Sequence, residues 1–325
     1  MQARHAIIRE NGGPDVIQWE DVTLADPGEG EVRMRNTAVG LNMIDTYHRK
    51  GVYPVELPSG LGLEAAGVVE AVGAGVTNLK EGDRVVTFGP MLGAYSTARN
   101  MPADRLFPLP DGVADDVAAA AFLKGCTTEF LVERCGKVES GWPVLVHAAA
   151  GGTGQLLCQW LKHIGAEVIG TTSSAEKAEK AKAAGADHVI LYTEEEVAPK
   201  VREITGGKGV RVVFDGVGKD TWEASLDSLG PRGLQISFGN ASAPVGDTNL
   251  AILAQKGSLF TTRPTLFDYY SEAADAQAGA ARLFSLLADG VLTVEIGQRY
   301  ALEEAAQAHI DLEGRKTFGS TVLIP

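Results

Sequence analysis

The chain has 325 residues, which is enough for two domains that each bury a substantial core. Hydrophobic residues make up 45% and charged residues 22%, as in ordinary globular proteins, and the formal net charge of -13 argues against general binding to nucleic acid or to an anionic membrane. No apolar stretch reaches membrane-spanning length and the N-terminal residues lack the apolar core of a signal peptide, so we expect a cytoplasmic protein with no membrane partner. Three scattered cysteines without a Cys-x-x-Cys pair indicate neither a disulfide framework nor a zinc ribbon.

The first 124 residues are predicted to be rich in β-strands. Apolar and β-branched residues recur in segments 31–39, 67–73 and 83–88. Clusters of glycine and proline, such as 27–30 and 81–83, separate these segments as turns do.

A different rhythm begins near residue 144, where an apolar strand leads into a glycine-rich turn and then into a helical pattern. The turn contains Gly151, Gly152, Thr153 and Gly154. Glycines let a backbone approach a pyrophosphate, and the start of the next helix favours negative charge, so this order predicts a dinucleotide site. The spacing is looser than Gly-x-Gly-x-x-Gly because Leu157 stands at the third position, and the alternative is a glycine turn of another α/β fold.

The following strand, 167–172, ends without the carboxylate that holds the ribose 2′-hydroxyl of NAD. It is followed instead by Ser173, Ser174 and Lys177. Hydroxyl groups and a lysine suit a 2′-phosphate, so we predict NADPH rather than NADH. The alternative is that the two serines only cap the helix expected over 175–184.

Strands and helices continue to alternate along the chain. Segments 189–191, 210–215 and 234–238 are predicted strands, and Thr193-Glu194-Glu195-Glu196 resembles a capping box that opens a helix to about residue 205. This alternation indicates a parallel sheet covered by helices. A helix is expected over 273–287, and we expect the final strand, 318–324, to return to the first domain.

With these elements in order, the chain resembles the zinc-free quinone oxidoreductases of the zeta-crystallin type, within the medium-chain dehydrogenase/reductase superfamily. Besides the glycine turn, the resemblance rests on segments 40–47, 58–67, 215–218, 237–240 and 255–259. It implies an α/β fold in two domains. A GroES-like β-barrel domain would be built from residues 1–124 and 265–325, and a Rossmann domain, a doubly wound parallel sheet, from residues 125–264.

The resemblance also implies that no metal is bound. Asn42 and Leu63 stand where the alcohol dehydrogenases of the superfamily carry a cysteine and a histidine as zinc ligands. Leucine cannot bind zinc, and Glu64 with nearby His48 does not make a site. Without a Lewis acid, an acceptor that is already electron-poor, such as a quinone or an enone, fits best.

Four residues are expected, by resemblance, to line the interdomain cleft beside the nicotinamide as the catalytic set: Asn42, Asp45, Tyr47 and Tyr53. Asn42 can hydrogen-bond a carbonyl or the ribose, and each tyrosine offers a flat face with a hydroxyl that could donate to a reduced oxygen. The alternatives are that the tyrosines only pack in a loop and that Asp45 caps a helix.

The remaining expected site residues would hold the cofactor. By resemblance they are Lys124, Gly151, Gly152, Thr153, Gly154, Ser173, Lys177, Tyr192, Val217, Phe238, Gly239, Asn240, Arg263 and Arg315. The alternatives are a surface position for Lys124 and solvated ion pairs for the two arginines. His147 is expected to be a structural hydrogen-bonding residue, and no sequence pattern groups His309 with other candidate site residues.

The function expected from these features is reduction of a quinone by NADPH. The alternatives are reduction of an α,β-unsaturated carbonyl compound on the same fold and a non-catalytic protein that binds NADPH or RNA. A homodimer is expected, with the strand near residues 258–261 pairing across a twofold axis as in the family.

Overall fold

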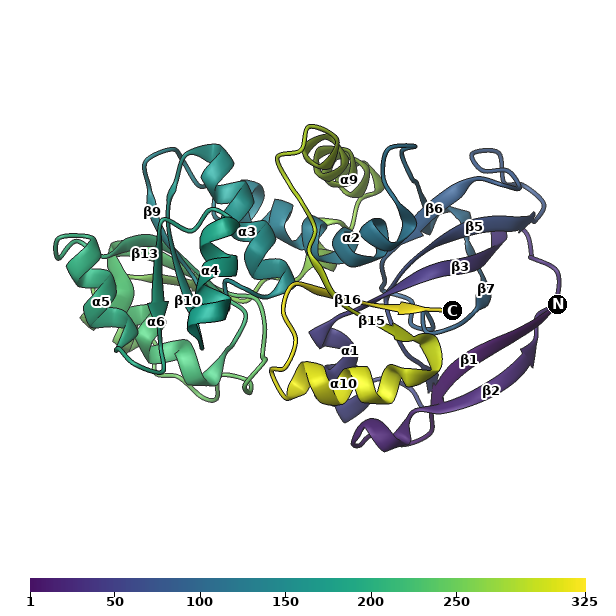
Figure 1. The fold of residues 1–325 in the computed structure, drawn as a ribbon, viewed down its shortest axis with the longest axis horizontal. Coiled ribbons are helices and arrows are strands. Elements are labelled where there is room, and N and C mark those ends of the chain that lie inside the picture. Colours follow the sequence, from purple (N-terminus) through teal and green to yellow (C-terminus); the bar gives the residue numbers. More distant parts are fainter. The chain divides into compact units, whose positions relative to one another are not determined.

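The computed structural model describes residues 1–325, which divide into two compact units. The first unit contains Met1–Leu123 and Val294–Pro325, and the second contains Lys124–Thr293 (Figure 1). None of the helices combines the length and the apolar content needed to cross a membrane.

The first unit is built mainly from antiparallel strands. Its strands are β1 (Gln2–Ile8), β2 (Gln18–Thr23), β3 (Glu31–Leu41), β4 (Ser59–Gly60), β5 (Glu64–Val72), β6 (Arg84–Thr87), β7 (Ala98–Pro102), β8 (Phe107–Pro108), β15 (Ile296–Ala301) and β16 (Ser320–Ile324). Its helices are α1 (Met43–Lys50), α10 (Ala305–Glu313) and most of α2 (Asp115–Glu129).

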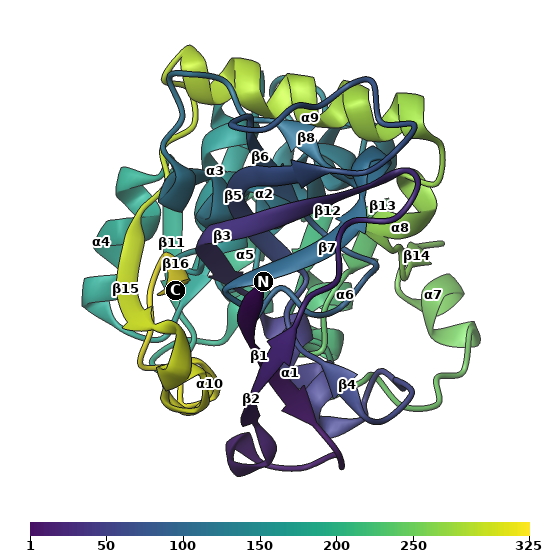
Figure 2. The same cartoon turned by 90° about the vertical axis from the view of Figure 1, so that its right-hand side faces the viewer.

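The main sheet of this unit has the order β15-β16-β3-β5-β6-β8, with β7 also paired to β3 (Figure 2). Strand β16 pairs with β3 in antiparallel register, Thr321 facing Leu41, so the C-terminal strand returns to the first unit as predicted. The buried side chains of β3, β5 and β16, among them Val32, Val69 and Leu323, form the core of the unit.

The second unit is a parallel sheet with helices on both faces. Its strands are β9 (Pro143–Val146), β10 (Glu167–Thr172), β11 (His188–Leu191), β12 (Val210–Asp215), β13 (Leu229–Ser237) and β14 (Phe260–Thr262). Its helices are α3 (Gly152–Ile164), α4 (Ala175–Ala183), α5 (Val197–Ile204), α6 (Trp222–Ser228), α7 (Ala251–Gln255), α8 (Leu266–Tyr269) and α9 (Ala273–Ala288).

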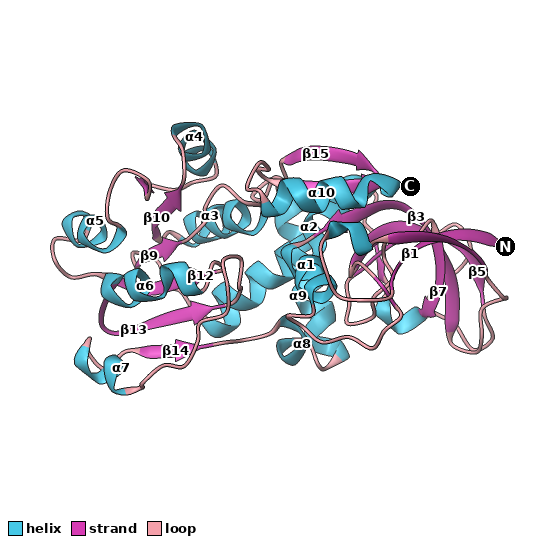
Figure 3. Ribbon diagram, turned by 90° about the horizontal axis from the view of Figure 1, so that it is seen from below, coloured by secondary structure: helices cyan, strands magenta, loops and turns pink.

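The strand order is β11-β10-β9-β12-β13-β14, so the chain changes direction between β9 and β12. Right-handed connections then place α3 and α4 on one face and α5 and α6 on the other (Figure 3). Strands covered on both faces need continuous apolar runs, and Val144, Leu145 and Val146 of β9 are indeed fully buried. The predicted doubly wound sheet is confirmed.

The predicted start of one helix was wrong, although the helix itself is present. The helix expected to open at Thr193 begins at Val197, and no side chain caps its N-terminus. The hydroxyl of Thr193 donates instead to the carbonyl oxygen of Ser173, at 3.2 Å. The residue types match a capping box, but the Thr193 hydroxyl hydrogen-bonds to the loop after β10 and therefore does not cap the helix.

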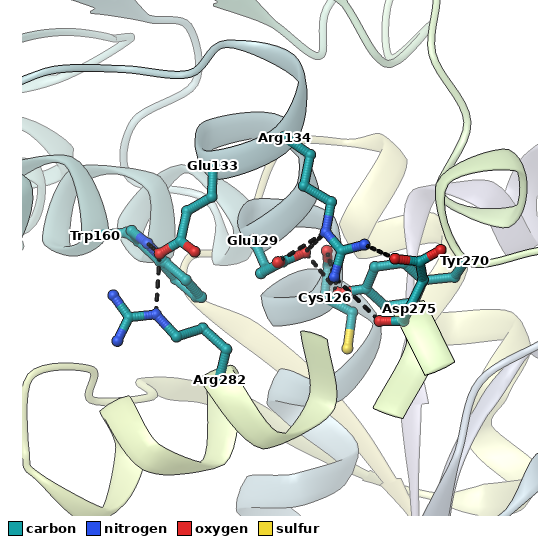
Figure 4. Close-up of polar contacts among 8 residues, drawn as sticks. All are labelled: Cys126, Glu129, Glu133, Arg134, Trp160, Tyr270, Asp275 and Arg282. Carbon is teal, nitrogen blue, oxygen red and sulfur yellow. Dashed lines mark hydrogen bonds and ion pairs between the residues drawn. The ribbon is translucent and has the colours of Figure 1, made fainter. Parts of the chain in front are cut away.

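The boundary of the second unit also differs from the expected one. Residues 265–293 group with the parallel sheet instead of with the first unit. Figure 4 shows two polar clusters in which Tyr270, Asp275 and Arg282 contact side chains at the end of α2 and in the turn after it.

We call the first of these the Arg134 cluster, formed by Glu129, Arg134, Tyr270 and Asp275. The Arg134 Nε donates to both carboxylate oxygens of Glu129, at 2.9 and 3.0 Å, and its Nη1 donates to Asp275 at 2.7 Å. The Tyr270 hydroxyl donates to Glu129 at 2.9 Å, and the guanidinium lies 5.1 Å from the centre of the Tyr270 ring. This cluster sits at a π-helical segment, Phe130–Cys135, that continues α2.

The second cluster is centred on Glu133. Its carboxylate accepts from the Trp160 indole at 2.9 Å and from Arg282 of α9 at 3.0 Å. Leu283, one residue further along α9, packs so closely against Gly125 that a Cβ there would lie 2.4 Å from a leucine methyl group. Ion pairs and close packing together tie α9 to the second unit.

Candidate active site

The glycine turn connects β9 to α3 and leaves the start of the helix open. Gly151 is the N-cap residue of α3, and no side chain accepts from the first backbone amides. A Cβ on Gly154 would lie 2.2 Å from the Ala148 carbonyl oxygen, so only glycine fits there. Uncapped amides beside a tightly folded turn suit the pyrophosphate of a dinucleotide, so these residues fit NADPH.

The loop after β10 is the place predicted for a 2′-phosphate. Ser174 caps α4, because its Oγ accepts from the backbone amide of Lys177 at 3.4 Å. Ser173 and Lys177 are half-buried, and Tyr192 is exposed. The capping role and the phosphate role are compatible, since a capped helix start still favours an anion.

The residues expected along the nicotinamide lie at the ends of β12 and β13. Val217 follows β12, whereas Phe238, Gly239 and Asn240 follow β13. The two loops touch: a Cβ on Gly239 would lie 2.4 Å from the Gly216 carbonyl oxygen. Together with the glycine turn and the loop after β10, they occupy the carboxyl edge of the parallel sheet, where open α/β sheets bind ligands.

A buried network that the sequence did not reveal supports this edge. The carboxylate of Asp215 accepts from the amides of Val217 and Gly218, at 2.9 and 3.1 Å, and from the Ser225 hydroxyl at 2.8 Å. Ser225 in turn lies 3.0 Å from His147 Nε2. The network therefore joins the loop after β12 to the residue that precedes the glycine turn.

His147 has the structural role expected for it. Its Nδ1 lies 3.1 Å from the hydroxyl of Thr171, near the end of β10. Burial lowers the pKa of His147, so the ring is neutral. Because a carboxylate can only accept, Ser225 donates to Asp215 and accepts from His147, which places the imidazole proton on Nε2.

The four residues expected on the acceptor side all belong to the first unit, around α1. Asn42 is the N-cap residue of this helix, and Asp45 completes the cap by accepting from the Asn42 amide at 2.9 Å. Asp45 is fully buried, so the capping alternative describes it correctly. Tyr47 is buried and Tyr53 half-buried, with ring centres 5.3 Å apart in an edge-to-face arrangement.

Asn42 also contacts the buried acid Glu64. Its Nδ2 donates to Glu64 Oε2 at 2.8 Å, and the second oxygen of Glu64 accepts from the Leu123 amide at 2.6 Å. Leu63 is buried beside it. This set contains neither a thiolate nor an imidazole, and no group of three His, Cys, Asp or Glu side chains is placed to hold a metal ion, so the residues present do not fit a zinc ion.

The three basic residues expected near the cofactor differ in their surroundings. Lys124 is buried, so the alternative of a surface lysine is wrong. Arg263 and Arg315 are both exposed. Arg263 belongs to the second unit, and its Nη1 donates to the Pro264 carbonyl oxygen at 3.3 Å. Arg315 lies in the first unit, one residue beyond the glycine that ends α10.

Comparison with known proteins identifies the family. Residues 28–111 match the alcohol dehydrogenase GroES-like domain, and residues 152–276 match the domain described as zinc-binding dehydrogenase. The chain is 53% identical over 321 residues to a quinone oxidoreductase of Salmonella typhimurium and 48% identical over 328 residues to a 2-haloacrylate reductase of Burkholderia; each match covers 98% of both chains. A crystal structure of Escherichia coli quinone oxidoreductase complexed with NADPH has a TM-score of 0.97 and 49% identity, covering 99% of this chain and all of that one. The chain belongs to the quinone oxidoreductase family of the medium-chain dehydrogenases/reductases.

Proposed function

We propose that this chain transfers reducing equivalents from NADPH to a quinone. The observation that carries the proposal is its similarity, over nearly the whole length, to quinone oxidoreductases, one of which is known in complex with NADPH. The loop after β10 supports the choice of cofactor, because it offers hydroxyl groups and Lys177 where an NAD-dependent enzyme needs a carboxylate.

The second unit would bind the cofactor at the carboxyl edge of its sheet. The backbone amides of the glycine turn, Gly151 to Gly154, would hold the pyrophosphate, while Ser173 and Lys177 would surround the 2′-phosphate. Tyr192 would lie near the adenine, and Val217, Phe238, Gly239 and Asn240 along the nicotinamide and its ribose. Lys124, Arg263 and Arg315 remain proposed contacts. When bound, NADPH supplies a hydride.

The first unit would orient the acceptor. We assign Tyr47 and Tyr53 to the planar ring of a quinone, because an aromatic face packs on a flat ring and a phenol can donate to the oxygen that gains charge. Asn42 would hydrogen-bond a carbonyl oxygen. Orientation, and not covalent chemistry, is the contribution expected of these residues.

Reduction of an activated double bond is the second candidate. The relative from Burkholderia is a 2-haloacrylate reductase, and a 2-haloacrylate is an α,β-unsaturated carboxylate. Because Leu63 is an apolar residue beside the buried Glu64, we expect an uncharged enone to be a better acceptor here than such a carboxylate.

The experiment that tests these proposals follows NADPH consumption with a small ortho-quinone and, separately, with a simple enone at equal concentration. Faster turnover of the quinone supports the proposal, and faster turnover of the enone replaces it with double-bond reduction. Turnover of neither, together with tight NADPH binding, would leave a binding protein; an RNA titration over a range of salt concentrations then tests the non-catalytic alternative.

We further propose a homodimer that pairs through β14, in the cytoplasm. Strand β14 is the outer strand of the parallel sheet, and the side chain of Phe260 on it is 60% exposed. An edge strand with an exposed aromatic side chain favours pairing with a second copy. None of the three cysteines forms a disulfide, which suits a reducing compartment. Light scattering at micromolar concentration tests the dimer, and a purely monomeric protein would refute it.

A further inference from the structure

Four ionisable side chains meet inside the first unit and have no part in the cofactor site. Asp45 and Arg49 come from α1, Tyr95 from the loop before β7, and His309 from α10. All four are fully buried, with 0% of each residue exposed. Burying such groups costs free energy unless each is hydrogen-bonded, so their arrangement calls for a functional explanation.

The four side chains form one continuous chain of hydrogen bonds. Arg49 Nη1 lies 2.8 Å from His309 Nδ1, and His309 Nε2 lies 3.0 Å from the Tyr95 hydroxyl. The Tyr95 hydroxyl lies 3.1 Å from Asp45 Oδ2. At the far end, Arg49 Nη2 donates to Glu313 at 2.8 Å and its Nε donates to the Gly12 carbonyl oxygen.

The chemistry of the two ends fixes the direction of every bond. A guanidinium can only donate, so Nδ1 of His309 accepts and the proton of the neutral ring is on Nε2. That N–H donates to the Tyr95 oxygen, and the Tyr95 hydroxyl then donates to Asp45. Burial, together with the positive charge of Arg49, lowers the pKa of His309 to about 3, which keeps the ring in this neutral form.

The chain ends at the start of α1. The oxygen of Asp45 that accepts from Tyr95 also accepts from the backbone amide of Asn42, at 2.9 Å. Asp45 thereby holds the first turn of the helix that carries Asn42 and Tyr47. A relay of protons along the whole chain is not its role, because the guanidinium of Arg49 at its end only donates hydrogen bonds and accepts none. Orientation is the role that remains.

We propose that Tyr95 and His309 are positioning residues, whose directed hydrogen bonds hold Asp45 and, through it, fix Asn42 at the acceptor side of the reaction. The inference rests on the proposed function in taking Asn42 as a residue that faces the acceptor. Asp45 is then not a catalytic residue but a positioning residue that holds Asn42. Buried ionic groups of this kind add little net stability, so their effect should be found in geometry instead.

The test compares two variants that each delete one tyrosine hydroxyl. Tyr95→Phe keeps the buried ring and removes the link between His309 and Asp45. Tyr300→Phe is the matched control: Tyr300 lies in the same unit, and its hydroxyl donates to Asp311 at 3.0 Å, outside the chain. Steady-state kinetics with the better of the two acceptors, NADPH titration and amide hydrogen exchange are measured for both variants and the wild type.

For Tyr95→Phe we expect kcat/KM for the acceptor to fall at least about tenfold, since small misplacements of a reacting group are costly. The Kd for NADPH should not change. Hydrogen exchange at residues 42–47 should quicken about tenfold, the factor for one hydrogen bond of ordinary strength. Tyr300→Phe should change none of these quantities.

Two substitutions of His309 provide a rescue within the same design. His309→Gln can place an amide N–H near the position of Nε2 and should keep most of the activity, whereas His309→Leu should lose as much as Tyr95→Phe. The double variant Tyr95→Phe/His309→Leu should have the same kcat/KM as either single variant, because both substitutions interrupt the same chain of hydrogen bonds. If Tyr95→Phe does not fold, the comparison of Gln with Leu at His309 decides the question.

Three results would overturn the inference. Tyr95→Phe could behave like Tyr300→Phe, or it could lose NADPH affinity by the same factor as kcat/KM for the acceptor. The third is an equal kcat/KM for His309→Gln and His309→Leu. Failure of the proposed function is distinguishable, because it shows in the wild type as turnover of neither acceptor. In that case the hydrogen exchange at residues 42–47 still tests the positioning role.

Discussion

Substitution of Arg134 by methionine tests whether the Arg134 cluster fastens α8 and α9 to the second unit. Methionine keeps the aliphatic stem and removes the charge and all four donated hydrogen bonds. The carboxylate of Glu129, whose side chain is only 5% exposed, then loses its positive partner and keeps the Tyr270 hydroxyl.

The expected cost follows from these surroundings. Breaking a buried ion pair from one side costs about 3–5 kcal/mol, because it leaves a buried charge uncompensated. The Arg134 side chain is 22% exposed, so water reaches the site and the lower end, about 3 kcal/mol, applies. For a domain of this size that corresponds to a decrease of roughly 6–12 °C in Tm.

Glu129→Gln provides the second half of a double-mutant cycle. In Glu129→Gln/Arg134→Met the stranded charge is gone, so the double variant should be more stable than Arg134→Met alone. Lys182→Met is the control, because the ion pair of Lys182 with Glu179 is mostly exposed and should contribute less than about 1 kcal/mol. Urea unfolding followed by tryptophan fluorescence measures the stability of the four variants and the wild type. A loss below about 1 kcal/mol for Arg134→Met, the value of an exposed pair, would refute the reasoning, as would a double variant less stable than Arg134→Met.

Three further outcomes are expected. Gly154→Ala should lower the free energy of unfolding by about 1–3 kcal/mol and weaken NADPH binding, because the added Cβ would lie 2.2 Å from the backbone of the turn. In the control Gly246→Ala the added Cβ meets no atom within 4 Å, so calorimetry should show no change in stability. Equal affinities of Gly154→Ala and the wild type for NADPH would contradict this account. Lys177→Ala should weaken NADPH binding roughly tenfold to hundredfold without affecting NADH, whereas Lys182→Ala should affect neither; an unchanged Kd for NADPH rules out the phosphate role. The pKa of His309, lowered to about 3 by burial, means that unfolding takes up a proton below the ordinary value of 6.5. The free energy of unfolding should therefore fall as the pH decreases from 6.5. In His309→Gln the slope of this free energy against pH, measured by urea unfolding, should be smaller by about 1.4 kcal/mol per pH unit. Identical slopes for the variant and the wild type would exclude the neutral ring.

The sequence was sufficient for most local features, although the capping box expected at Thr193 was wrong. The strand, glycine turn and helix around Gly154 are set by the spacing of adjacent residues, and so is the serine cap of α4. Asn42 and Asp45 lie three residues apart at a helix start, and this spacing indicated that Asp45 caps the helix. The resemblance to the family nevertheless led us to place Asp45 in the catalytic set.

Features formed by distant residues could not be predicted in this way. Tyr95 and His309 are 214 positions apart, and the pattern of each segment gives no reason to pair them. The boundary of the second unit lies at residue 293, beyond the expected 264, and the added segment includes Asp275, which contacts Arg134 from 141 positions away. Such contacts depend on the folded arrangement of elements and not on local periodicity.

The place of β16 in the main sheet has a consequence for the order of folding during synthesis. This strand, Ser320–Ile324, lies between β15 and β3, so the first unit needs both ends of the chain. The second unit is continuous and can complete its sheet while the ribosome is still translating. Until the last strand is made, residues 39–41 at the end of β3 have no partner on this side, although residues 31–35 already pair with β7. Loss of the last six residues should therefore leave a nascent protein that binds NADPH but exposes an open sheet edge to chaperones and proteases.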